Sequence, residues 1–174
     1  MTTELIELLK LTVPAGIVLL SAFYIVKMFL QKEYDTLSIK MKSDQQEQTL
    51  PLKLQAYERL ALFLERISYT EILDRTNYEE FNAISTQQVL IMTIKEEFNH
   101  NLSQQIYISP DLWEMIRGAK EQSISFINNS AKELPADATG LDLAKVILEK
   151  SISEEATPTV LALNELKKEV QAIF

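Results

Sequence analysis

The chain has 174 residues, and 17 Lys and Arg stand against 25 Asp and Glu, for a net charge of −8. It contains no Cys, one His and three Gly, which excludes thiol nucleophiles, disulfides, thiolate metal centres and a glycine-rich phosphate loop. The acidic excess argues against nucleic-acid binding, because neutralising phosphates needs basic residues. The length allows one domain with an anchor or tail.

An uncharged apolar segment lies near the N-terminus, over residues 11–26. As a helix it rises about 24 Å, and residues 8–30 together reach the roughly 30 Å of a hydrocarbon core. We therefore predict a transmembrane anchor within residues 1–30 that contacts lipid through residues 8–30. Pro14 is expected near the start of this helix, where a missing N–H is tolerated. A cleaved signal sequence and a buried core helix are the alternatives.

Basic residues flank this segment unequally. One lysine precedes it and four follow it closely: Lys10, then Lys27, Lys32, Lys40 and Lys42. The positive-inside rule then predicts a single-pass protein of the bacterial inner membrane, with its N-terminus outside and its C-terminal domain in the cytoplasm. The four lysines after the segment form a basic collar that suits anionic headgroups. Lys10, Lys27 and Lys32 are the expected membrane-interface residues.

The anchor is expected to continue into a stalk and then a linker. Residues 31–42 still permit a helix, whereas residues 43–49 are polar without apolar periodicity and Pro51 follows them. We place a stalk and polar linker at residues 31–50 and a cytoplasmic helical bundle at residues 51–174.

Helical periodicity and capping signals divide the bundle. A helix after Pro51 carries an apolar face of Leu52, Ala56, Leu60, Phe63, Leu64 and Ile67. Residues 69–84 fit a short helix or an ordered loop equally well. Ser85 and Gln88 form a capping-box pattern before a long helix with Ile91, Ile94, Phe98, Leu102 and Gln105.

Three further helices are expected. Ser109 caps the first, Thr139 with Asp142 opens the second, and Thr157 caps the third. Their expected buried residues are Leu112, Ile116, Ala119 and Ile127, then Leu143, Val146, Ile147 and Ile152, then Leu163, Leu166, Val170 and Phe174. Residues 105–108 are the only strand candidate. The fold class is therefore all-α, with an N-terminal transmembrane helix and a bundle of about five helices.

Three strings carry a resemblance to a known family. They are LQAYERLALFLERI at residues 54–67, EEFNHNLSQQIY at residues 96–107, and Trp113 followed by AKE at residues 119–121. With the N-terminal span, the chain resembles an uncharacterised family of small single-pass membrane-anchored helical proteins of Bacteroidetes-type bacteria. The resemblance implies an architecture and a cellular setting, but no activity, cofactor or catalytic residue.

One spacing points to metal chemistry. Glu97 and His100 have the Glu-x-x-His spacing of di-iron helical bundles, which need a second such pair and further carboxylates. His100 is the only histidine, so we expect no metal, no cofactor and no enzymatic activity. A ligand-binding, metal-binding or enzymatic bundle that uses His100 and nearby Glu remains the alternative.

The end of the same helix is rich in uncharged polar residues. Three interpretations stand for this run: a buried network between helices, a strip that contacts a partner, or a solvated face. The candidates for partner contact are His100, Asn101, Gln104, Gln105, Tyr107 and Trp113. Arg59 and Arg66 lie seven residues apart, so they share a face and can pair with acidic groups of another helix.

These patterns favour a non-enzymatic interaction module that scaffolds or regulates an inner-membrane complex from the cytoplasmic side. Its expected partners are membrane lipid and a protein or a second copy of the chain, and no nucleic acid. A sensor of anionic membrane surfaces that acts through the basic collar is a further alternative.

Overall fold

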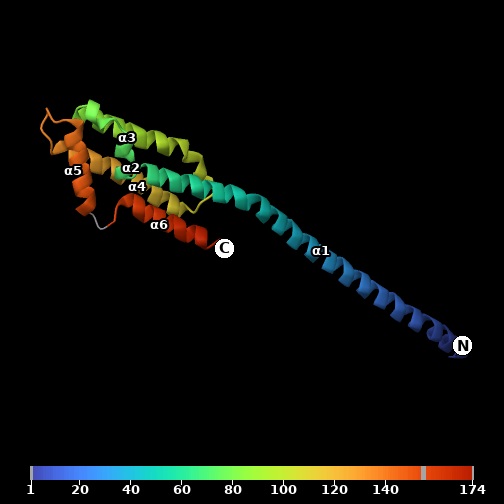
Figure 1. The fold of residues 1–174 in the computed structure, drawn as a ribbon. Helices are drawn as coiled ribbons and strands as arrows, with labels where there is room; N and C mark the ends of the chain where they lie inside the picture. The colour runs from blue at the N-terminus through green and yellow to red at the C-terminus, as the bar shows by residue number, and fades with distance from the viewer. Residues whose placement is uncertain (1, 154–155, 174) are drawn as a thin grey trace. The chain divides into compact units, whose positions relative to one another are not determined.

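The computed structural model describes the backbone of residues 2–153 and 156–173, and the side chains of residues 3, 10, 12–41, 47–153 and 156–173 (Figure 1). Six α-helices and two short 3-10 helices make up this part of the chain, and it contains no strand beyond an isolated bridge between Asn82 and Thr139. The all-α prediction is confirmed, and residues 105–108 form no strand. The chain divides into two compact units, residues 1–50 and 51–174.

Helix α1, Thr2–Arg66, is longer than the sequence indicated. Its backbone is helical through the polar stretch at residues 43–49, where we expected a linker. Three of the seven residues in this stretch are Gln and one is Glu, and both residue types are good helix formers. Pro14 lies well inside the helix and not in its first turn, so that expectation was wrong.

The first unit holds the apolar segment. Thr12–Met41 is long and apolar enough to cross a membrane, with a mean hydropathy of 2.0 in its most apolar 18-residue window. None of that window is buried. Lys10, Lys27 and Lys32 are all exposed on this helix.

In the second unit, the last turns of α1 bury one face. Ala56, Leu60, Phe63, Leu64 and Ile67 are buried as predicted, whereas Leu52 is exposed. The segment whose conformation was left open contains a short helix α2, Tyr69–Asp74, and a 3-10 helix η1, Tyr78–Glu80.

The N-cap of helix α3, Ala83–His100, lies three residues before the expected cap. The side chain of Asn82 accepts a hydrogen bond from the Ser85 backbone N–H at 2.8 Å, so Asn82 is the N-cap and the capping box at Ser85 was wrong. The α-helix ends at His100, before Gln105, and the chain tightens into the 3-10 helix η2, Leu102–Ile106.

The remaining helices start where the sequence indicated. They are α4, Pro110–Lys132, α5, Gly140–Ser153, and α6, Pro158–Gln171. The predicted residues of α4 are buried, as are Leu143, Ile147, Leu163 and Leu166, whereas Ile152 is exposed. Val146 and Val170 are half-buried, and Phe174 lies outside the described residues.

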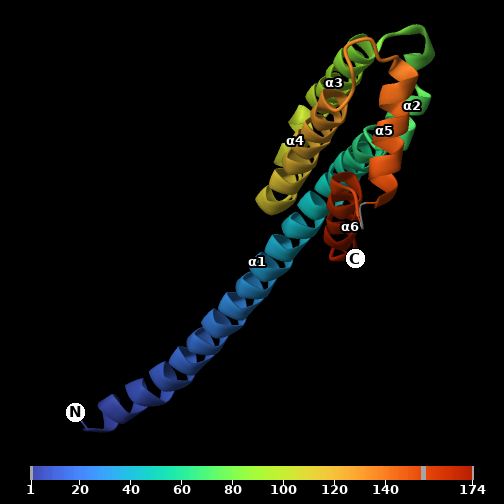
Figure 2. The same ribbon diagram turned by 90° about the vertical axis from the view of Figure 1, so that its left-hand side faces the viewer.

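The helices of this unit pack around one core. Helix α4 lies beside α3 (Figure 2). It also packs against α6, and α5 packs against α3 and α4. Backbone hydrogen bonds from Ala83 N to Ala138 O, 3.0 Å, and from Gly140 N to Phe81 O, 2.8 Å, tie the start of α5 to the start of α3. The core therefore joins segments that are far apart in the sequence.

Candidate functional site

A row of aromatic rings joins three helices beside the predicted contact strip. Phe98 on α3 meets Phe63 on α1 edge-on, with 5.8 Å between ring centroids, and stacks on Trp113 of α4 at 5.3 Å. The Lys120 Nζ lies 4.5 Å from the centre of the Phe98 ring, a cation–π contact. Trp113 is therefore part of the packing that holds α4 on α3, which is the commoner role of such a ring.

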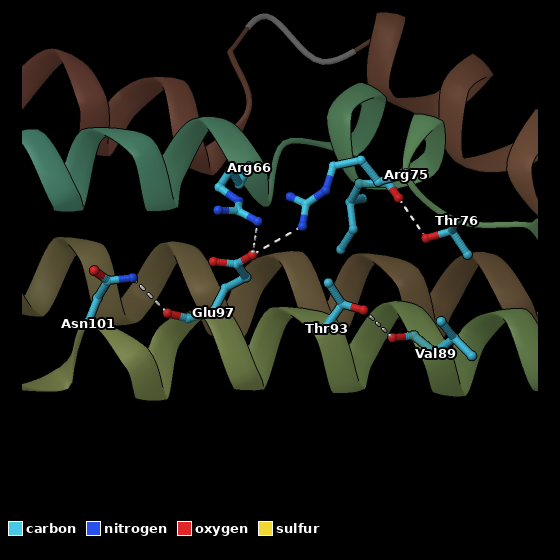
Figure 3. Close-up of polar contacts among 8 residues, drawn as sticks. Arg66, Arg75, Thr76, Val89, Thr93, Glu97 and Asn101 are labelled. Atoms are coloured by element: carbon cyan, nitrogen blue, oxygen red, sulfur yellow. Dashed lines mark hydrogen bonds and ion pairs between the residues drawn. The ribbon is translucent and has the colours of Figure 1, made fainter.

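A carboxylate on the same helix gathers two arginines. The Glu97 Oε1 lies 2.8 Å from the Arg66 Nη2 at the end of α1 and 3.1 Å from the Arg75 Nη2 after α2 (Figure 3). The Glu97 side chain is 14% exposed, against 50% for Arg66 and 38% for Arg75. The expected pairing of Arg66 with an acidic group of another helix is confirmed.

A second carboxylate lies near the end of α6. The Glu169 Oε1 accepts hydrogen bonds from the Tyr57 Oη, 2.7 Å, and from the Ser109 N, 2.9 Å, and its Oε2 accepts one from the Ser109 Oγ. The Ser109 Oγ also accepts a hydrogen bond from the Leu112 N at 3.2 Å, as an N-cap does. Glu169 therefore places negative charge at the N-terminus of α4, where a helix stabilises it.

The surroundings of this carboxylate shift two pKa values, its own and that of Tyr57. Burial on its own raises the pKa of Glu169, but the hydrogen bonds from Ser109 and Tyr57, with Lys53 nearby, outweigh it and leave that pKa below its ordinary value. Burial and the hydrogen bond to Glu169 raise the pKa of the Tyr57 phenol. Glu169 thus remains ionised, and Tyr57 neutral, across the physiological range.

The polar candidates make local hydrogen bonds. The Asn101 Nδ2 donates to the Glu97 backbone oxygen at 2.8 Å, the Gln104 Nε2 to the Ser103 Oγ at 3.3 Å, and the Gln105 Nε2 to the Leu102 oxygen at 3.0 Å. These bonds finish α3 and hold η2 instead of joining neighbouring helices. They do not support the network interpretation.

The candidates also differ in exposure. His100 and Gln105 are exposed, Asn101, Tyr107 and Trp113 are half-buried, and Gln104 is buried. Leu102 and Ile106 of η2 are exposed, and the side chain of Ile106 is 73% accessible. The surface of this segment therefore combines an imidazole and an amide with two apolar side chains.

Comparison with known families gives one result. The model of a family of unknown function, DUF7935, matches residues 3–173. The chain belongs to this family. No curated protein and no solved structure matches it. Membership in DUF7935 agrees with the expected likeness to an uncharacterised family and assigns no activity.

The DUF7935 chain offers little to a metal at the Glu-x-x-His spacing. Glu97 is already bound by two arginines, and His100 is exposed on the last turn of α3. Among the residues whose side chains are described, no group of three His, Cys, Asp or Glu lies close enough to hold a metal ion.

Sequence reasoning missed the two carboxylate clusters of the DUF7935 bundle. Glu169 lies 60 residues from Ser109 and 112 from Tyr57, and Arg75 lies in the segment whose conformation was left open. The available signals were a seryl N-cap at residue 109 and a glutamate amid the apolar residues of the last helix. Neither signal indicated that Ser109 and Glu169 would contact each other.

Proposed function

We propose that this protein is a single-pass membrane protein of the bacterial inner membrane whose helical bundle is a non-enzymatic interaction module. The first unit anchors the chain, and the second unit contacts a protein partner of a membrane complex. The observation that carries the proposal is an apolar helix that nothing in the described structure covers.

Exposure and sequence both support a retained anchor. A core helix of a soluble protein is mostly buried, yet none of the 18-residue window is buried here. A secretory signal normally has a basic start and a small-residue cleavage site, whereas Glu4 and Glu7 precede the first lysine and no clear cleavage triplet follows the apolar run. A retained anchor accounts for both observations, because lipid covers the apolar side chains.

The charges around the anchor support an orientation. Lys27, Lys32 and Lys40 are exposed after the apolar run, and Lys10 is exposed before it. Because basic residues tend to be retained on the cytoplasmic side, this asymmetry supports a bundle in the cytoplasm and an N-terminus outside.

The bundle supports binding better than catalysis. The carboxylates of Glu97 and Glu169 are occupied by arginines and by a helix cap. His100, Leu102, Gln105 and Ile106 are all exposed where α3 ends and η2 follows, so this surface mixes apolar and polar side chains, as contact patches do. We assign the partner contact to this surface.

Membrane fractionation with alkaline carbonate tests the anchor. The full chain is expected in the pellet, and Leu20→Lys, in the middle of the apolar run, is expected to shift protein to the supernatant, because a charged residue at that depth costs about 3 kcal/mol. Ile152→Lys is the matched control, because Ile152 is 83% exposed on α5 and outside the apolar run. A full chain that is extracted into the supernatant would contradict the anchor.

Two further measurements test orientation and partner. A phosphatase fused after Phe174, active only outside the cytoplasm, is expected to be inactive. Crosslinking of intact membranes is expected to join the bundle to a defined partner, and Ile106→Asp is expected to remove that product, while Ile152→Asp retains it. An active phosphatase would overturn the orientation, and a product unchanged by Ile106→Asp would overturn the contact surface.

A further inference from the structure

The helix beyond the apolar segment carries an uncovered stripe that suits a second copy of the chain. We propose that two anchors pack side by side in parallel through Leu30, Tyr34, Leu37 and Met41. This inference rests on the proposed membrane anchoring. It adds an oligomeric state and the residues that form it.

The stripe has the spacing of a coiled-coil seam. Leu30, Tyr34, Leu37 and Met41 are separated by four, three and four residues, so they alternate between positions d and a of a heptad. All four are exposed in the structure, Tyr34 to 75%. The charged residues between them, Lys32, Glu33, Asp35 and Lys40, occupy other heptad positions.

The stripe also has the four-residue spacing that such packing needs. In a coiled coil, one apolar side chain inserts between four residues of the facing helix, spaced i, i+3, i+4 and i+7. Leu30, Glu33, Tyr34 and Leu37 have that spacing, and all four side chains are exposed. A side chain from a second helix can insert between them.

With the predicted lipid contact at residues 8–30, lipid does not cover the whole stripe. Because the backbone of α1 is helical throughout this segment, Met41 lies about 16 Å along the axis from Leu30. A span that ends near Leu30 therefore carries Tyr34, Leu37 and Met41 out of the hydrocarbon core. An apolar stripe in water is stabilised when another protein surface covers it.

A second copy meets the geometric conditions for that surface. Anchors in one membrane have the same orientation, so the same residues of two copies lie at the same depth, and a two-fold axis along the membrane normal pairs each stripe with itself. The neighbouring e positions, Gln31 and Ser38, are uncharged, so the charges at the g positions, Glu33 and Lys40, meet no like charge there.

The heptad continues back into the apolar segment. Phe23 and Gly16 fall at positions d, seven and fourteen residues before Leu30. A Cβ added to Gly16 would have no neighbour within 4 Å, so this position leaves room for a close helix approach, as small residues do in membranes. Lys27 falls at a position a, from which its long side chain can extend to the headgroups.

Cysteine crosslinking tests the seam directly, because the chain has no cysteine of its own. Single variants Tyr34→Cys, Leu37→Cys and Met41→Cys of the full chain are oxidised with copper phenanthroline in isolated membranes. The matched controls are Asp35→Cys, Thr36→Cys and Ile39→Cys, which lie on other faces of the same helix. We expect about fivefold more disulfide-linked dimer from the seam variants than from the controls.

A charge within the seam provides an independent check. Leu37→Glu, combined with Met41→Cys, is expected to reduce the dimer to the level of the controls, whereas Thr36→Glu is expected to leave it unchanged. Equal crosslinking at all six positions, or a maximum at residues 35, 36 and 39, would overturn the dimer. Carbonate extraction of the same membranes separates the two proposals, because a chain that stays in the pellet without seam crosslinking contradicts the dimer alone.

Discussion

Glu169 of α6 holds Ser109, the N-cap of α4. The Glu169 carboxylate, near the end of α6, accepts a hydrogen bond from the Ser109 backbone N–H at 2.9 Å, immediately before α4. Ser109 in turn caps α4 through its hydroxyl. One carboxylate therefore supports a helix start and, through Tyr57, also holds α1.

Glu169→Gln is expected to destabilise the bundle. The amide removes the charge that accepts three hydrogen bonds, and hydrogen bonds to a charged group contribute about 1.5 to 3 kcal/mol each. We expect the free energy of unfolding to fall by about 2 kcal/mol. Urea unfolding of the full chain in mild detergent, followed by Trp113 fluorescence, measures this, since Trp113 is the only tryptophan and reports on the bundle. Glu165→Gln is the control, because Glu165 pairs only with its helical neighbour Lys168; equal losses would contradict the role of Glu169.

The same carboxylate makes stability depend on pH. The pKa of Glu169 is lower in the folded protein than its ordinary value, which is about 4.3 in an unfolded chain. Its contribution is therefore fully present above that ordinary value and is lost as the pH falls through the folded value. We expect the stability difference between the wild type and Glu169→Gln to be constant from neutral pH to about pH 5 and to shrink at lower pH. A difference that grows in acid would contradict the assignment.

Gly140→Ala is expected to distort the start of α5. A Cβ at this position would lie 2.1 Å from the Tyr78 backbone oxygen and 2.4 Å from the Thr86 Oγ1. The Tyr78 oxygen belongs to the backbone and cannot rotate away, so we expect a loss of about 1 to 3 kcal/mol, as overpacking causes.

Gly118→Ala tests the same substitution in open space. The nearest atom to its Cβ would be 3.9 Å away, at the end of the flexible Gln122 side chain. In the interior of α4, alanine is favoured over glycine by about 1 kcal/mol, so this variant should be neutral or more stable. If both variants lose the same stability in urea unfolding, the close approach at Gly140 is not its cause.

Local chemistry explains which features of the fold could be predicted. Ser109 and Thr139 mark helix starts through hydrogen bonds to residues three positions away. Both partners therefore lie in one short segment, where the pattern can be recognised. Ser85 misled us because Asn82, three residues earlier, makes the same kind of bond and occupies the cap. The local sequence offers both residues as N-caps, and only the tertiary contacts of the helix decide which one is used.

Long-range partners could not be predicted from the pattern. Arg66 was expected to pair with some acidic residue of another helix, but the choice of Glu97 depends on how α1 and α3 align in the core. Of the polar residues after Glu97, Gln104 is buried and Gln105 is exposed. The sequence predicted an α-helix through Gln105, but residues 102–106 form a 3-10 helix. Its three residues per turn, instead of 3.6, place these side chains on other faces than an α-helix would.

The two arginines on Glu97 are expected to act redundantly. Both contact the same oxygen, so after Arg66→Ala or Arg75→Ala the carboxylate retains one partner. Each single variant should cost about 0.2 to 1 kcal/mol, the range of exposed ion pairs. The double variant should cost more than the sum, because Glu97 is 14% exposed and is then left without either arginine. Urea unfolding of the wild type, the two single variants and the double variant gives the coupling free energy directly.

Arg117→Ala is the matched control, because Arg117 and its partner Glu114 are 57% and 60% exposed. Its loss of stability should simply add to that of Arg66→Ala. Additive losses for Arg66→Ala and Arg75→Ala would mean that each arginine acts on its own, and Glu97 would then not hold the ends of α1 and α2 on α3.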